Sequence, residues 1–201
     1  MYLAGNQLFS NGELRDWLAE RLEQAKAFVM SFTTEEFKRS DMLLESAVMS
    51  RFRVPEVHLI VEECYFVDEK EMTVAEANLP MEGQPVEGAV PLPPDTKLKA
   101  VTIAIPFQGP HQLLTMRPNV FSAHQPEAEV RGQELIVDFV APLAVEDHIE
   151  NRFQQHIALI ERTLEVTQWQ AMDFNTDLPM KVRALIRQRR AEVRPPTEAA
   201  R

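Results

Sequence analysis

Three charged residues at the end of an apolar run have the spacing of a metal-dependent nuclease site. Asp68 and Lys70 form the acid-x-Lys pattern of restriction-type nucleases, and Glu45 or Glu56 could supply a second acid. In such sites two carboxylates hold Mg²⁺, and the lysine stabilises the attacking hydroxide or the developing charge. Solvated charges at the end of a strand are the simpler interpretation, because most carboxylates and ammonium groups lie at the surface. A small Mg²⁺-dependent nuclease is therefore an alternative hypothesis.

Two histidines and an arginine share one face of a predicted helix near the other end of the chain. His148, Arg152 and His156 follow one another at intervals of four residues. The rise of a helix places the two histidines about 12 Å apart along its axis. A zinc ion binds imidazole nitrogens at about 2.1 Å, so the two histidines cannot share one ion. We therefore predict a solvated polar stripe here and no metal site.

The irregular segment 117–121 is the most distinctive candidate for contact with a ligand or partner. It follows a predicted strand, and nothing in its composition indicates a simple turn. Phe121 could fill the core, or the segment could bind a partner with Arg117 as an anion contact. His111 and His124 lie in neighbouring loops and could line a pocket, although neither has a nearby acid in the sequence to orient it. These four residues are the candidate contact residues.

Other catalytic chemistries lack their sequence motifs. The chain contains no Gly-x-Ser-x-Gly elbow, no phosphate-binding P-loop and no Gly-x-Gly-x-x-Gly turn, and its six glycines are scattered. The single cysteine, Cys64, has acidic neighbours, whereas a catalytic thiolate needs electropositive surroundings. We therefore assign no catalytic residue, no metal ligand and no cofactor.

The charge of the chain argues against a nucleic-acid or membrane partner. Its 201 residues carry a formal net charge of −10, which repels anionic polymers and anionic lipid surfaces. Residues 181–194 are the exception, and we expect this basic segment to end a C-terminal helix and to pair with the acidic body. A nucleic-acid-binding patch is the alternative, but the segment lacks interleaved aromatic residues. The longest uncharged run, residues 100–116, is interrupted by two prolines and a glycine and cannot cross a bilayer. We expect a cytoplasmic protein.

Hydrophobic periodicity predicts an α+β fold with an N-terminal helix pair, an antiparallel sheet of about five strands and two C-terminal helices. Residues 11–54 hold the helix pair. Ser10 with Glu13, and Thr33 with Glu36, have the spacing of capping boxes that begin helices, and Pro55 ends the second.

The sheet is expected within residues 56–141. Residues 57–68 alternate with apolar residues on both faces, which predicts a central strand covered on both sides. Residues 99–107 form a second strand, with residues 112–116 pairing back against it. Gly132 and Gln133 form a two-residue hairpin turn. The Pro-rich segment 79–95 is a long loop.

Two helices are expected within residues 144–194. Apolar residues keep helical spacing to about Met172, Asn175 is a candidate stop, and Asp177 can cap a last helix that begins near Pro179. Residues 1–194 would then form a single α+β domain, and residues 195–201 would be a linker or tail.

Two short patterns resemble a known module. Ile105-Pro-Phe-Gln-Gly-Pro110, followed by Arg117-Pro118, is the first, and Asp173-Phe174-Asn175-x-x-Leu178, followed by Arg189-Arg190, is the second. They are similar to an uncharacterised N-terminal module of bacterial multidomain proteins, many of them in antiphage defence, in which a TIR or nuclease effector follows. The resemblance implies a sensing or assembly role, with the chemistry carried by a domain outside this chain.

The residues themselves favour the same class of function. Strong amphipathic helices without a recognisable nucleophile, metal set or phosphate loop are typical of a binding unit. We expect a non-enzymatic regulatory, sensing or assembly domain that self-associates or acts with an effector domain or protein. The alternatives are the nuclease and a small-ligand sensor with a pocket under the Pro-rich loop.

Overall fold

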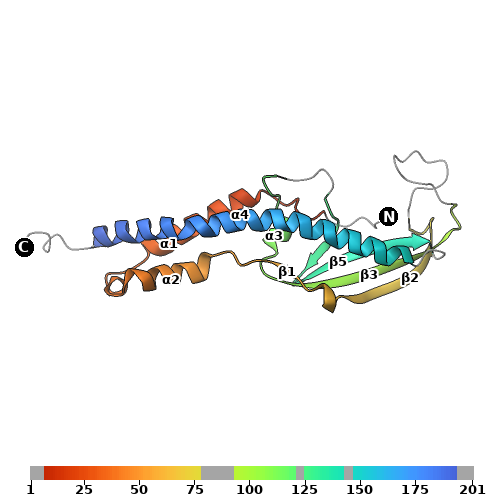
Figure 1. Ribbon diagram of the computed structural model, residues 1–201, viewed down its shortest axis with the longest axis horizontal. Coiled ribbons are helices and arrows are strands. Elements are labelled where there is room, and N and C mark those ends of the chain that lie inside the picture. Colours follow the sequence, from red (N-terminus) through yellow and green to blue (C-terminus); the bar gives the residue numbers. More distant parts are fainter. Residues whose placement is uncertain (1–6, 78–92, 121–124, 143–146, 194–201) are drawn as a thin grey trace, which may run out of the picture.

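The computed structural model describes residues 7–77, 93–120, 125–142 and 147–193 and shows an elongated molecule (Figure 1). Most of the predicted loop 79–95 and the predicted tail 195–201 lie outside these ranges. In chain order the elements are α1 (Leu14–Met30), the 3₁₀ helix η1 (Glu36–Lys38), α2 (Asp41–Phe52), β1 (His58–Leu59), the 3₁₀ helix η2 (Val61–Glu63), β2 (Tyr65–Thr73), β3 (Lys97–Gln108), α3 (Gln112–Thr115), β4 (Glu129–Arg131), β5 (Glu134–Pro142) and α4 (Asp147–Val193). The predicted α+β class is confirmed.

Strand β3 is the centre of the antiparallel sheet. β5 pairs along one edge of β3, and β4 pairs with β5 beyond it. On the other edge, β2 pairs with residues 97–104 and β1 with residues 107–108 of β3. The predicted hairpin between β4 and β5 is confirmed, and Gly132 in its turn has a φ of +61°, which glycine adopts without strain.

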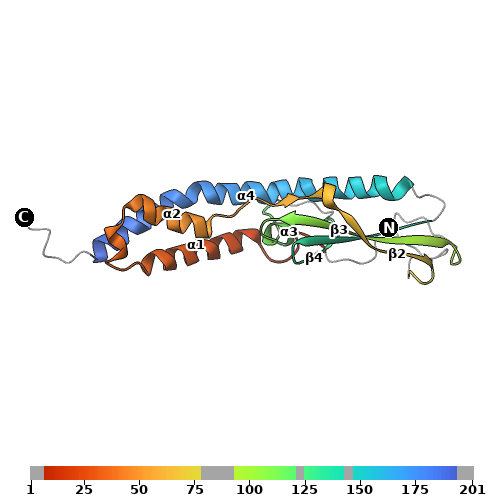
Figure 2. The ribbon, with the colours of Figure 1, turned by 90° about the horizontal axis from the view of Figure 1, so that it is seen from below.

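The first half of α4 covers one face of the sheet (Figure 2). Alternate residues of β3 and β5 meet it in a continuous core, as expected for strands whose side chains alternate between faces. The apolar stripe predicted on this helix is the face that packs there, with buried Phe153, Ile157, Ile160 and Leu164.

The second half of α4 packs with α1 and α2 at the opposite end of the molecule (Figure 2). Leu178, Val182 and Ile186 are buried there among apolar residues of both N-terminal helices. Arg21 of α1 donates to the backbone oxygens of Phe52, Arg51 and Arg53, so it satisfies the carbonyl groups at the end of α2. The predicted N-terminal helix pair is confirmed.

One of the two predicted capping boxes forms. The carboxylate of Glu36 accepts hydrogen bonds from the backbone and hydroxyl of Thr33, and the Glu36 amide donates back to that hydroxyl. This box begins η1, whereas α2 begins one turn later at its own cap, Ser40. The box predicted at Ser10 and Glu13 is wrong, because the Ser10 hydroxyl donates to the Gln7 oxygen and Glu13 binds an arginine instead.

The two predicted C-terminal helices are one continuous helix of 47 residues, α4. Asn175 lies inside α4 and does not end a helix. Its side chain binds a distant segment instead: Oδ1 accepts from the Val54 amide at 2.9 Å, and Nδ2 donates to the Val54 oxygen at 2.8 Å. Pro179 lies inside the helix and leaves one backbone hydrogen bond unmade. Burial of Leu178 and Val182 on either side of Pro179 offsets that loss.

Two predictions within the sheet are wrong. Residues 57–68 do not form a central strand, because the chain turns at η2 and β2 begins only at Tyr65, at the edge of the sheet, with most of its residues exposed. Residues 112–116 do not pair with β3. They form the short helix α3, which buries Leu113 and Leu114 side by side, whereas a strand would point them to opposite faces.

Replacing the proline within α4 tests whether the helix is continuous in solution. We expect Pro179→Ala to raise the free energy of unfolding by about 1 to 3 kcal/mol, because alanine restores the missing donor and removes the ring. Urea denaturation monitored by circular dichroism measures this change. Ala184→Pro, at an exposed position of the same helix half, should lower stability by about 3 kcal/mol. A less stable Pro179→Ala protein would contradict the continuous helix.

Candidate functional site

Arg117 joins two segments of this chain. Its Nε donates to Glu13 Oε1 at 2.9 Å, and its Nη2 contacts the same oxygen. The Arg117 amide donates to the Gly12 oxygen, and the Leu14 amide donates to the Arg117 oxygen. This arginine therefore fastens the start of α1 to the segment that follows α3, which gives it a structural role within the fold.

The other predicted contact residues are not brought together with Arg117 in the part of the chain that the structure describes. His111 is exposed at the start of α3, where it lines a shallow cleft of about 380 Å³ with Asn11 and Thr115. Phe121 and His124 lie outside the described residues.

The residues of the nuclease hypothesis are spread over the molecule. Asp68 and Lys70 pair with Thr102 and Ala100 of β3, so their side chains lie on the face of the sheet away from α4. Glu45 belongs to α2, which lies at the other end of the molecule (Figure 1), and it is bound to Arg183. Within the described ranges, no three His, Cys, Asp or Glu residues lie close enough to hold a metal ion. The geometry gives this hypothesis no support.

His156 does not belong to a solvated stripe, as predicted, but is buried against the sheet. Its Nε2 donates to the Glu127 oxygen at 2.9 Å, and its ring and that of Phe139 form a T-shaped pair. Burial lowers the pKa of this imidazole, and the hydrogen bond to Glu127 opposes that effect only in part. Arg152 donates to the Val140 oxygen. The side chain of His148 lies outside the described part.

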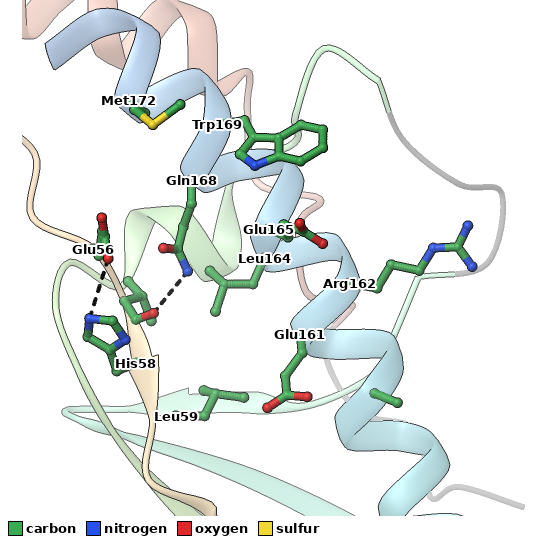
Figure 3. A pocket seen from close by; sticks show the side chains of 12 residues that line it. Glu56, His58, Leu59, Glu161, Arg162, Leu164, Glu165, Gln168, Trp169 and Met172 are labelled. Atoms are coloured by element: carbon green, nitrogen blue, oxygen red, sulfur yellow. Dashed lines mark hydrogen bonds and ion pairs between the residues drawn. The ribbon is translucent and has the colours of Figure 1, made fainter. Parts of the chain in front are cut away.

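A cleft with a volume of about 700 Å³ runs alongside the middle of α4 (Figure 3). One wall is the segment that contains β1, contributing Glu56, Val57, His58 and Leu59. The other wall is α4, contributing Glu161, Arg162, Glu165, Gln168, Trp169 and Met172.

Side chains of α4 hold the β1 wall in place. Gln168 Nε2 donates to the Val57 oxygen at 2.9 Å and so joins α4 to the β1 segment (Figure 3). About two turns further along α4, Asn175 binds both backbone groups of Val54, three residues before Val57. His58 faces Glu56, with 3.6 Å between Nε2 and Oε2. The separation of the two walls is therefore set by hydrogen bonds between this segment and the helix.

Large apolar side chains are exposed at the cleft and beyond it on the same helix. Trp169, Met172 and Met180 have exposed fractions of 58%, 57% and 68%. They lie on the side of α4 opposite to its buried stripe, and we call this side the outer face of α4. Its members are Arg162, Glu165, Trp169, Met172, Thr176, Met180, Arg183 and Arg187, and all are exposed.

The cleft and the basic segment of α4 differ in charge. The cleft is lined by the exposed carboxylates of Glu56, Glu161 and Glu165 and by the guanidinium group of Arg162. The predicted pairing of the basic segment with the acidic body is confirmed at two points, because Arg183 binds Glu45 at 2.7 Å and Arg190 binds Asp41 at 2.6 Å.

Comparison with protein-family models, with curated proteins and with solved structures found no match. Among the described residues, no helix combines the length and the apolar character needed to cross a membrane. The function of this chain must therefore be argued from its own surfaces.

The exposed residues of the outer face were not among the contact residues predicted from the sequence. A signal for them is present, however. Trp169 and Met172 fall between the inward positions of the stripe, where a solvated helix carries polar residues. A tryptophan at such a position indicates either a second packing surface or a surface that binds a partner.

The buried histidine predicts a pH dependence of stability. Its pKa is lowered on folding, so the unfolded chain binds a proton first, and stability is lost as pH falls below about 6.5. The slope from this group is at most about 1.4 kcal/mol per pH unit. Urea denaturation at pH 7.5 and pH 5.5 should show that His156→Gln, which keeps a donor for Glu127, depends less on pH than the unaltered protein. An equal dependence would contradict the buried neutral imidazole.

Proposed function

We propose that this chain is a non-catalytic assembly domain that self-associates through the outer face of α4. The observation that carries the proposal is the exposed apolar group formed by Trp169, Met172 and Met180. Tryptophan and methionine are enriched in protein interfaces, and tryptophan is a frequent hot spot of binding energy. Scattered apolar residues are ordinary on a surface, but three large ones along one face of a helix form a patch suited to a partner.

The outer face of α4 is complementary to the outer face of a second copy when the two helices run antiparallel. Glu165 and Arg183 lie at equal distances along α4 on either side of Phe174, and eighteen residues are about five helical turns, so both project from the same side. A two-fold axis near Phe174 would therefore set Glu165 against Arg183 of the partner subunit, and the reverse contact would form by symmetry.

The apolar residues obey the same symmetry. Trp169 and Met180 lie at nearly equal distances from Phe174 and are separated by about three helical turns. In the antiparallel arrangement, Trp169 packs on Met180 of the partner subunit, with Met172 near the axis. The acidic cleft of each copy then faces the basic half of the other copy's helix, which is the charge complementarity that steers association.

A sensing or assembly role is also what the resemblance to modules that precede TIR or nuclease effectors implies. In that setting, self-association would bring effector domains together. The resemblance supports the class of function, whereas the partner surface rests on the residues of α4 alone.

The apolar part of the proposal is tested by light scattering. The unaltered protein should have twice the mass of one 23.0 kDa chain, and Trp169→Glu or Met180→Glu should give the single-chain mass, because each places a carboxylate in the apolar centre. Val67→Glu is the matched control, since Val67 is an exposed apolar residue of the edge strand β2 and not of α4. Circular dichroism verifies folding. A single-chain mass for the unaltered protein would overturn the proposal.

Charge reversal tests the antiparallel register. In a Glu45→Gln background, which removes the internal partner of Arg183, Glu165→Arg should weaken dimerisation by about tenfold, because two contacts per dimer become repulsive. Adding Arg183→Glu should restore it. The register also sets Arg162 near Arg187 of the partner subunit, so Arg162→Glu should tighten the dimer. Analytical ultracentrifugation measures the constants, and failure of Arg183→Glu to restore association would exclude this register.

A further inference from the structure

A second cleft, of about 470 Å³, lies between the sheet and the first turns of α4. Its floor is formed by Val101 and Ile103 of β3 and by Phe153 of α4, and all three are buried. Its mouth carries the exposed ring of Phe66 and the side chains of Glu69 and Glu150. Its volume is within the range of roughly 300 to 1,000 Å³ that small-molecule sites occupy.

A β-bulge brings the residues of the mouth onto one face of the sheet. In a regular strand, Phe66 and Glu69 would project to opposite faces, because they are an odd number of residues apart. The register shifts between Phe66 and Asp68, so that Phe66 pairs with Ile103 and Glu69 pairs with Val101. Both partners face α4, and the aromatic ring and the carboxylate therefore line the same cleft. Bulges often redirect a side chain next to a binding site.

The charges at the mouth are unequal. Lys99 Nζ lies 3.0 Å from Glu69 Oε1 and balances that carboxylate, whereas Glu150 adds a second negative charge at the helix side of the cleft. Among the described residues that line this cleft, carboxylates outnumber the ammonium group by two to one, which favours a ligand of positive charge over a ligand carboxylate. The ring of Phe66, with an exposed fraction of 69%, offers a face on which an organic cation can rest.

We propose that this cleft binds a small amphipathic organic cation. The apolar part of the ligand lies on Val101, Ile103 and Phe153, and its ammonium group lies between Glu69 and Glu150 against the ring of Phe66. The contact residues are separate from the outer face of α4, so the site is independent of self-association.

Calorimetric titration with two probes that share an eight-carbon tail tests the charge preference. Octyltrimethylammonium should bind saturably at one site per chain, and sodium nonanoate, which has the same octyl tail and the opposite charge, should bind at least about tenfold more weakly. Nonanoate binding as tightly as the cation would overturn the proposal, and so would the absence of saturable binding by the cation at millimolar concentrations.

A pair of neighbouring substitutions locates the site. Glu69→Gln should weaken binding of octyltrimethylammonium about tenfold, because it removes one of the two carboxylates at the mouth. Asp68→Asn is the matched control: it removes the same charge from the same strand, but its side chain projects to the opposite face, so the affinity should not change. Both sites are exposed and should tolerate the change. Equal effects of the two substitutions would overturn the proposal.

Discussion

The continuity of α4 is the constraint on which the rest of the structure depends. A helix of 47 residues is about 70 Å long, and here it belongs to both large hydrophobic cores. Its first half completes the core of the sheet, and its second half completes the three-helix core, with Phe174 packed against both clusters. Neither end can bury its apolar residues without this helix, so the two ends form one elongated body (Figure 1).

Polar side chains of α4 give the helix a second role. They bind backbone groups of residues that lie outside the strands of the sheet. Thr167 donates to the Leu113 oxygen, Gln168 to the Val57 oxygen and His156 to the Glu127 oxygen. Buried backbone groups left without such partners would be costly. The same bonds determine where the β1 segment runs, and so they shape the cleft beside the outer face. The packing of the two hydrophobic cores and the shape of the candidate surface therefore both depend on α4.

Local signals predicted several elements correctly, for identifiable reasons. The hairpin at Gly132 needs only a glycine between two alternating segments, and the box at Thr33 needs only two side chains three residues apart. The inward stripe of α4 follows from helical periodicity. The break at Asn175 was predicted wrongly because its amide contacts Val54, which is far away in the sequence. The buried position of His156 depends in the same way on a distant strand, β5.

The candidate surfaces show the same difference between what local sequence patterns determine and what contacts between distant segments determine. Composition and periodicity by themselves determined the α+β class, the placement of long helices at both ends of the chain with strands between them, and the basic end of the last helix. Tertiary structure alone decided that β2 lies at an edge, that a bulge turns Phe66 and Glu69 to one face, and that Trp169 is left uncovered. The physical reason is that a local pattern specifies which residues seek burial, whereas exposure depends on which distant segments arrive to cover them.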